Sequence, residues 1–120
     1  MSTDLATLLA EPGLAYIVAL DSQSAEFVLA AQATISLSHR APIVALDPND
    51  AIFDAVQDGR ASCAVFGDPY FCGFTAIERL GIYRNAHKEA LPVAGRGSYA
   101  LVPEVVSKQN VVEFRRRLRS

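Results

Sequence analysis

Three carboxylates stand at or just beyond the ends of short apolar runs, namely Asp21, Asp47 and Asp68. If these runs are parallel strands, their carboxyl ends share one edge of a sheet, which is where open α/β proteins bind ligands. Ionised carboxylates at that edge accept hydrogen bonds from sugar hydroxyls, or bind a hard cation such as magnesium. Each aspartate could equally do no more than cap the helix that follows it. The positions predict a ligand site and leave a structural role open for each residue.

The residues around Asp68 favour a sugar over a metal ion. Magnesium-dependent phosphoryl chemistry requires a nearby lysine and a hydroxyl side chain. The segment Phe66-Gly67-Asp68-Pro69 contains neither. Carbohydrate sites pair polar acceptors with aromatic faces, and Phe66 is the first of several aromatic residues in this region. Core packing is the alternative role for these rings. We therefore expect Phe66 to lie with the three aspartates in a sugar site.

Other side chains that could do chemistry lack the partners they need. Cys63 and Cys72 have neither the spacing of a zinc site nor that of a redox pair, so we expect two free thiols. His39 and His87 fall in predicted loops without a partner nucleophile. The Gly-Arg-Gly segment 95–97 lacks the strand-to-helix setting of a phosphate loop and is expected to form a turn. The sequence thus predicts no catalytic site, no metal and no cofactor.

The chain has 120 residues, of which 51% are hydrophobic, so it can bury a core and is expected to form a single domain. Its 11 basic and 13 acidic residues give a net charge of -2, which favours neither nucleic acid nor an anionic membrane as a direct partner. The first residues lack the basic segment of a signal peptide, and the apolar run 14–20 is too short to span a membrane. By these features alone the chain is expected to stay in the cytoplasm.

Apolar runs and amphipathic segments alternate through the first half of the chain. Strand, helix, strand, helix, strand at this spacing predicts right-handed crossovers and a three-layer α/β sandwich with a mainly parallel sheet. Continuous apolar runs are typical of strands that are covered on both faces. The predicted strands are 14–20, 42–46 and 61–66, and the predicted helices are 3–10, 23–37 and 50–57, with Ser22 as the cap of the second helix.

The second half of the chain is less regular. We expect a helix over 70–83, short extended pieces at 89–93 and 98–102, and an amphipathic helix over 110–119. The last helix carries three arginines at 115–117, which suit a solvated helix end because cations stabilise helix C-termini.

From Asp47 onward the chain resembles ribose-type periplasmic sugar-binding proteins. Residues 47–60 read DPNDAIFDAVQDGR, similar to that family's strand-ending Asp and the helix that closes on a Gly and a basic residue. Residues 61–73 read ASCAVFGDPYFCG, similar to its strand that runs into Gln-Asp-Pro-Tyr and then a Gly. Residues 106–114 read VSKQNVVEF, similar to its closing Val-Thr-Lys-Glu-Asn-Val segment. The whole chain resembles the C-terminal part of a type I periplasmic solute-binding protein.

The resemblance implies the substrate-binding component of an ABC transporter, with a sugar or related polyol as ligand, a membrane permease as partner and no enzymatic activity. It implies a periplasmic location, which conflicts with the absence of a signal peptide from this sequence. The family's sugar-contacting positions fall at Leu20, Asp47 and Gly67, where the family has Asn, Asp and Gln. Because only Asp47 keeps its type, the resemblance implies either a different ligand or a lost site.

The length of the chain also departs from the family, whose members are built from two lobes that close on the ligand. A chain of this size is expected to be a C-terminal fragment, or a half-protein completed by a homodimer or by a complementing N-terminal chain. Two other functions stay open. One is the effector-binding part of a sugar-responsive repressor, which shares the fold. The other is a small magnesium-dependent receiver-like protein using the three aspartates, although its activating lysine is missing.

Overall fold

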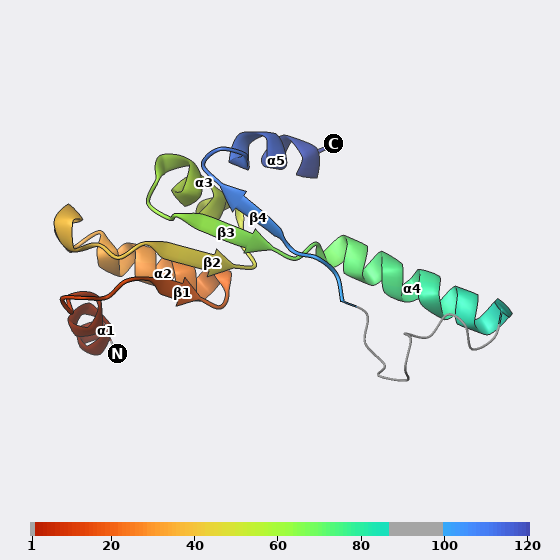
Figure 1. Cartoon of the computed structure of the whole chain (residues 1–120), viewed down its shortest axis with the longest axis horizontal. Coiled ribbons are helices and arrows are strands. Elements are labelled where there is room, and N and C mark those ends of the chain that lie inside the picture. Colours follow the sequence, from red (N-terminus) through yellow and green to blue (C-terminus); the bar gives the residue numbers. More distant parts are fainter. Residues whose placement is uncertain (1, 87–99) are drawn as a thin grey trace. The chain divides into compact units, whose positions relative to one another are not determined.

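The computed structural model describes residues 2–86 and 100–120, which form two compact units. One unit comprises residues 1–66 with 104–120, and the other comprises residues 67–103. The expectation of a single domain stays a prediction. In chain order the elements are α1 (Ser2–Leu9), β1 (Ile17–Ala19), α2 (Ser22–Gln32), a 3-10 turn (Leu37–His39), β2 (Ile43–Leu46), α3 (Asp50–Asp58), β3 (Cys63–Phe66), α4 (Pro69–Ala86), β4 (Glu104–Ser107) and α5 (Val111–Leu118) (Figure 1).

The first unit is built on a four-stranded sheet with the strand order β1-β2-β3-β4. Strands β1, β2 and β3 run parallel, and β4 pairs antiparallel with β3. The predicted α/β fold with a mainly parallel sheet is confirmed. In the sheet, Ala19 is opposite Ala45, Ala45 is opposite Ala64, and Ala64 is opposite Val106. This row of mostly small buried residues lets helices approach the sheet closely.

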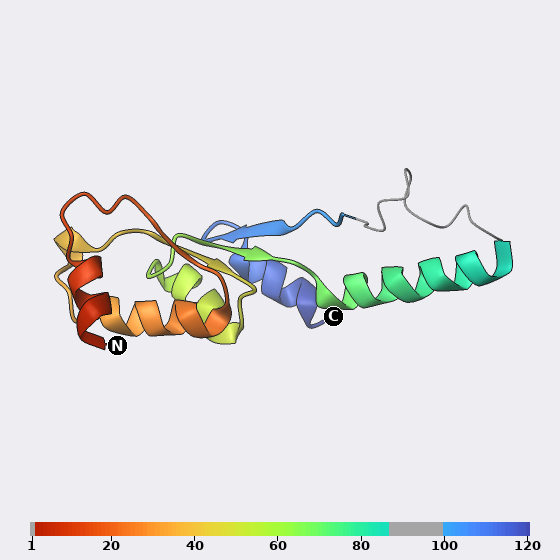
Figure 2. The ribbon, with the colours of Figure 1, turned by 90° about the horizontal axis from the view of Figure 1, so that it is seen from below.

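Helices α2, α3 and α5 all lie on one side of this sheet (Figure 2). They bury one apolar cluster against it, and each helix contributes residues at helical spacing. The cluster closes on three aromatic rings, in which Phe114 stands 5.5 Å from Phe53 and 5.2 Å from Phe66 between ring centroids. The fully buried large side chains of the core are Ile43, Ile52, Val56, Val106 and Val111.

The opposite face of the sheet carries apolar side chains that stay accessible. Val18 of β1 is 57% exposed and Val105 of β4 is 55% exposed. The expectation that the first strand is covered on both faces is therefore wrong. The strand is also shorter than the predicted 14–20. β1 is an edge strand that pairs with β2 alone, and only Ile17–Ala19 take part in that pairing.

Helix α2 ends earlier than predicted because side chains capture the carbonyl groups after it. Arg40 donates hydrogen bonds to the carbonyls of Ile35 and Ala33, at 2.9 and 3.3 Å. The buried Gln32 amide donates to the carbonyl of Ala41 at 2.8 Å. Leu37, expected on the buried face of a longer helix, is instead 80% exposed in the 3-10 turn. The N-cap of α2 is Asp21 rather than Ser22, since the Asp21 carboxylate accepts from the N–H of Ser24.

The sequence did not predict strand β4, which begins directly after Pro103. It did predict the last helix, observed as α5, and the helix in residues 70–83, observed as the longer α4. The predicted extended piece at 89–93, nearly all of that at 98–102 and the predicted turn at 95–97 lie outside the described residues.

The described part of the second unit consists mainly of helix α4, whose 18 residues show several large apolar side chains to solvent. Asp68 begins this helix, and its carboxylate accepts from the N–H of Phe71 at 3.1 Å. Within the described residues, no helix is long and apolar enough to cross a membrane.

Candidate functional site

Asp47 ends strand β2 in a backbone conformation that few residues adopt. Its φ is 48°, the single positive φ at a non-glycine residue among the described positions. Aspartate tolerates this left-handed region better than most side chains. The Asp47 N–H donates to the carbonyl of Val65 at 3.1 Å, which ties the turn to strand β3, and the side chain is exposed. Backbone strain held in place at a strand end is a feature of functional sites.

The turn that holds Asp47 is fixed from two further sides. Pro48 is buried, and Asn49 caps α3 by accepting from the N–H of Ile52 at 3.1 Å. The Asn49 amide also donates to the Glu26 carboxylate at 2.6 Å, which links the turn to α2. An Asn just before an amphipathic helix is a recognisable cap signal that the sequence analysis missed. Its bond to Glu26 has no local signal, because the two residues are 23 positions apart.

Asp21 lies at the carboxyl end of β1 and serves as the N-cap of α2. Its carboxylate accepts from the N–H of Ser24 at 2.7 Å. Backbone and side-chain hydrogen bonds from Ser24 lower the pKa of this carboxyl below its ordinary value. The neighbouring Leu20, at the position where the resembled family has Asn, is exposed and offers no polar group.

The other three predicted site residues follow or end β3. Phe66 points its ring into the helix side of the sheet, against Phe53 and Phe114. Gly67 is exposed, and Asp68 uses its carboxylate to cap α4 within the second unit. As ligand contacts these three residues stay predictions.

The three strand-end aspartates therefore differ in how their carboxylates are engaged. Asp21 and Asp68 each accept a backbone N–H of the following helix, whereas the Asp47 carboxylate has no hydrogen-bond or ion-pair partner in residues 2–86 and 100–120. Over the same residues, no group of three or more His, Cys, Asp or Glu side chains could hold a metal ion. What the described geometry offers is one free carboxylate at the strand ends of the first unit.

Cysteine and histidine side chains have the surroundings of structural or surface groups. Cys63 is half-buried and Cys72 is exposed, and both are free thiols. His39 shares its ring nitrogen with two serine hydroxyls, at 2.8 Å from Ser36 and 3.0 Å from Ser38. His87 lies outside the described residues.

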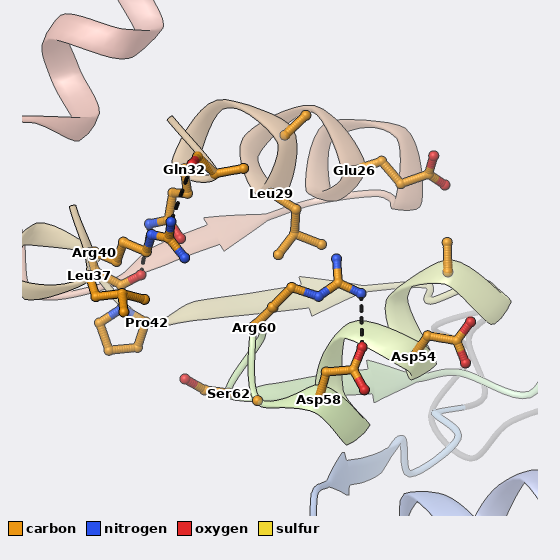
Figure 3. A pocket seen from close by; sticks show the side chains of 15 residues that line it. Glu26, Leu29, Gln32, Leu37, Arg40, Pro42, Asp54, Asp58, Arg60 and Ser62 are labelled. Carbon is orange, nitrogen blue, oxygen red and sulfur yellow. Dashed lines mark hydrogen bonds and ion pairs between the residues drawn. The ribbon is translucent and has the colours of Figure 1, made fainter. Parts of the chain in front are cut away.

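A groove of about 790 Å³ runs between α2 and α3, with Leu29 at its centre (Figure 3). Pro42 and Ser62, which directly precede β2 and β3, line it, and Asp47 is not among its lining residues. Arg60 lies over the groove and pairs with Asp58 at 3.2 Å. No buried side-chain nitrogen or oxygen in the described residues lacks a hydrogen-bond partner. Among the described residues, the groove therefore has no buried polar side-chain atom that lacks a partner.

Comparison with solved structures finds a protein of similar fold. The carbohydrate transporter from Acidothermus cellulolyticus 11B, solved in complex with myo-inositol, is similar to this chain with a TM-score of 0.74 and 21% sequence identity. The alignment covers 97% of this chain and 39% of that one. No protein-family model and no curated protein matches the sequence.

This likeness defines the class of fold. Over the matched part the chain has the same α/β fold as this carbohydrate transporter, and it spans about two fifths of that protein's length. At this sequence identity the match shows the fold and does not identify the chain as a ribose-type protein.

Proposed function

We propose that this chain is a sugar- or polyol-binding module of a carbohydrate uptake system, that it has no catalytic activity, and that Asp47 is its main ligand contact. The observation that carries the proposal is the free carboxylate of Asp47 beside the two engaged carboxylates of Asp21 and Asp68. The similar carbohydrate transporter holds myo-inositol, a ring of adjacent hydroxyl groups. Two neighbouring hydroxyls can donate to one carboxylate, which is the group that Asp47 presents.

The fixed turn at Asp47 supports this role. Its backbone is tied to β3 through Val65, to α3 through the Asn49 cap, and to α2 through Glu26. A carboxylate held in place before binding loses little conformational freedom when a ligand arrives.

The expected affinity is low. Hydrogen bonds to a charged group contribute about 1.5–3 kcal/mol each, and association costs at least about 4 kcal/mol in lost freedom of motion. One carboxylate that accepts two hydroxyls therefore yields at most about 2 kcal/mol, which corresponds to a Kd no tighter than about 30 mM. Leu20 and Gly67 add no side-chain hydrogen bond of the kind that the resembled family has at these positions.

A transport protein of useful affinity needs further polar contacts from a partner. The proposal therefore includes a second copy or a complementing chain that covers the strand ends, a membrane permease that receives the ligand, and a periplasmic location. The similar transporter is longer than the segment that matches, which is consistent with a site completed by additional chain.

The direct test is a ligand-observed NMR titration of the purified chain with myo-inositol, ribose and a panel of hexoses. Asp47→Asn removes the charge and keeps a side chain that accepts the left-handed backbone, and we expect at least about tenfold weaker binding. Asp58→Asn is the matched control, because it removes an exposed carboxylate beside the groove of Figure 3. Equal binding by Asp47→Asn and the wild type would refute the assignment.

A further inference from the structure

The carboxyl ends of β1 and β2 lie side by side, since the two strands are parallel neighbours (Figure 1). The last residue pair of their ladder is Ala19 with Ala45. Leu20 comes one residue after this pair, and Asp47 comes two residues after it. With strands about 4.8 Å apart and a rise of about 3.3 Å per residue, the Cα atoms of Leu20 and Asp47 are roughly 6 Å apart. One sugar ring can therefore contact both residues.

Leu20 shows its side chain to solvent at this edge of the sheet, with 71% of it exposed. Successive side chains alternate between the two faces of a strand, so Leu20 belongs to the face of Val18, opposite the helices. Leu46 belongs to the same face, because its neighbour Ala45 is buried under the helices. Val65 is opposite Leu46 in the ladder, and both are half-buried. We call Leu20, Leu46 and Val65 the apolar shelf.

The apolar shelf offers a ligand no side-chain hydrogen bond. Its three side chains are aliphatic, and Gly67 after β3 has no side chain. The carboxylate of Asp21 is engaged by the N–H of Ser24. A sugar hydroxyl over the shelf would give up water without gaining a partner, which weakens binding. A methyl group at the same place would strengthen binding, because apolar surface leaves water on both sides of the contact.

These surroundings suit a ligand with two unlike edges. Asp47 accepts a pair of neighbouring hydroxyls, and the apolar shelf contacts an edge that has none. We propose that Leu20 is the specificity-determining residue of the Asp47 site, and that the ligand is a 6-deoxyhexose. In such a sugar a methyl group stands where the parent hexose has a hydroxymethyl group. The inference rests on the proposed function, because it requires a polyol bound at Asp47.

The buried methyl group sets the size of the preference. Removal of one methyl-sized group from water changes a binding constant about fourfold. We therefore expect the wild type to bind a 6-deoxyhexose about fourfold more tightly than the parent hexose.

The test compares sugars that differ only in this group, by ligand-observed NMR titration. L-fucose with L-galactose is one such pair, and L-rhamnose with L-mannose is another. We expect the fourfold preference for the deoxy sugar in the pair that binds more tightly. Leu20→Ala removes the exposed part of the shelf and should abolish the preference. Leu20→Asn supplies a donor and an acceptor and should reverse it.

The variants are expected to fold, because Leu20 is an exposed side chain, and thermal melts check this. Val112→Ala is the matched control, since it removes an exposed apolar side chain from helix α5 and should keep the preference.

The outcomes separate this inference from the proposed function. Equal binding of the deoxy and parent sugars by the wild type, with both weakened by Asp47→Asn, would overturn the inference alone. A preference that persists in Leu20→Ala would also overturn it, because the selectivity would then come from elsewhere. No measurable binding of any sugar, or binding that Asp47→Asn leaves unchanged, would overturn the proposed function and this inference with it.

Discussion

At the scale of single residues, the hydrogen bonds of an aspartate carboxylate decide whether it caps a helix or stays available to a ligand. Asp21 gives its carboxylate to the first turn of α2, whereas the carboxylate of Asp47 is free in the described residues. Helix N-termini stabilise negative charge, so a capping carboxylate prefers its ionised form. The same side chain without a cap is left available for a ligand.

The cap at Asp21 predicts a pH dependence of stability. Its pKa is lower in the folded chain than its ordinary value of 3.8, so the ionised cap stabilises the fold above that pH. The contribution is lost as the pH falls through the lowered value. We expect Asp21→Ala to lower the melting temperature at neutral pH, and the difference from the wild type to shrink in acid. Asp58→Ala, which alters an exposed ion pair, should show no such convergence.

The sequence predicts Phe66 as a ligand contact, and the structure gives its ring two aromatic packing partners. The ring packs with Phe53 and Phe114, so Phe66→Ala should destabilise the fold by about 3 kcal/mol in urea unfolding and leave myo-inositol binding at Asp47 unchanged. Phe66→Leu should recover much of the stability. Unchanged stability together with lost binding would instead show that the ring faces the ligand.

At the scale of elements, the alternation of apolar runs predicted the three parallel strands and the helices that join them. That signal is local, since a buried strand or helix must be apolar at its own period. The end of α2 depends on Arg40 and Gln32, which reach back to carbonyl groups across several residues. Strand β4 depends on pairing with β3 across about 40 positions, so nothing near Glu104 reveals it. The missed features are those fixed by partners far along the chain.

The same reasoning explains how much of the candidate site was predictable. Asp47 could be predicted as a candidate because a carboxylate after an apolar run is a local pattern. The Glu26–Asn49 link was missed because it joins α2 to the turn before α3. What the sequence could not distinguish was a free carboxylate from a capping one, since both follow strands and precede helices.

The link between Glu26 and Asn49 can be measured by a double-mutant cycle. Removal of the Asn49 cap by Asn49→Ala should cost about 1 kcal/mol, and Glu26→Ala less, because Glu26 is exposed. We expect a coupling energy of about 0.5 kcal/mol between them in urea unfolding. Glu26→Gln keeps a hydrogen-bond acceptor and should restore most of the coupling. Strictly additive effects would mean that the bond does not form in solution.

At the scale of the whole molecule, the first unit has a core of its own. Every residue of the buried apolar cluster lies in residues 1–66 or 104–120, and helix α5 is tied to α3 by an ion pair from Arg115 to Asp50 at 3.3 Å. The Arg115 side chain is also hydrogen-bonded to Asp54, and this bond raises the pKa of the guanidinium. The second unit contributes nothing to this cluster, so the first unit should fold without it.

A shortened chain can test this independence together with the proposed function. Phe66 is directly opposite Glu104 in the antiparallel ladder, so residues 67–103 can be replaced by an Asn-Gly turn that closes a β-hairpin. We expect cooperative thermal unfolding, with myo-inositol binding that is still abolished by Asp47→Asn.

A shortened chain that unfolds without cooperativity would show that the core of the first unit needs residues 67–103. Lost binding in a well-folded, shortened chain would instead assign ligand contacts to those residues, in which Gly67 and Asp68 were predicted to take part.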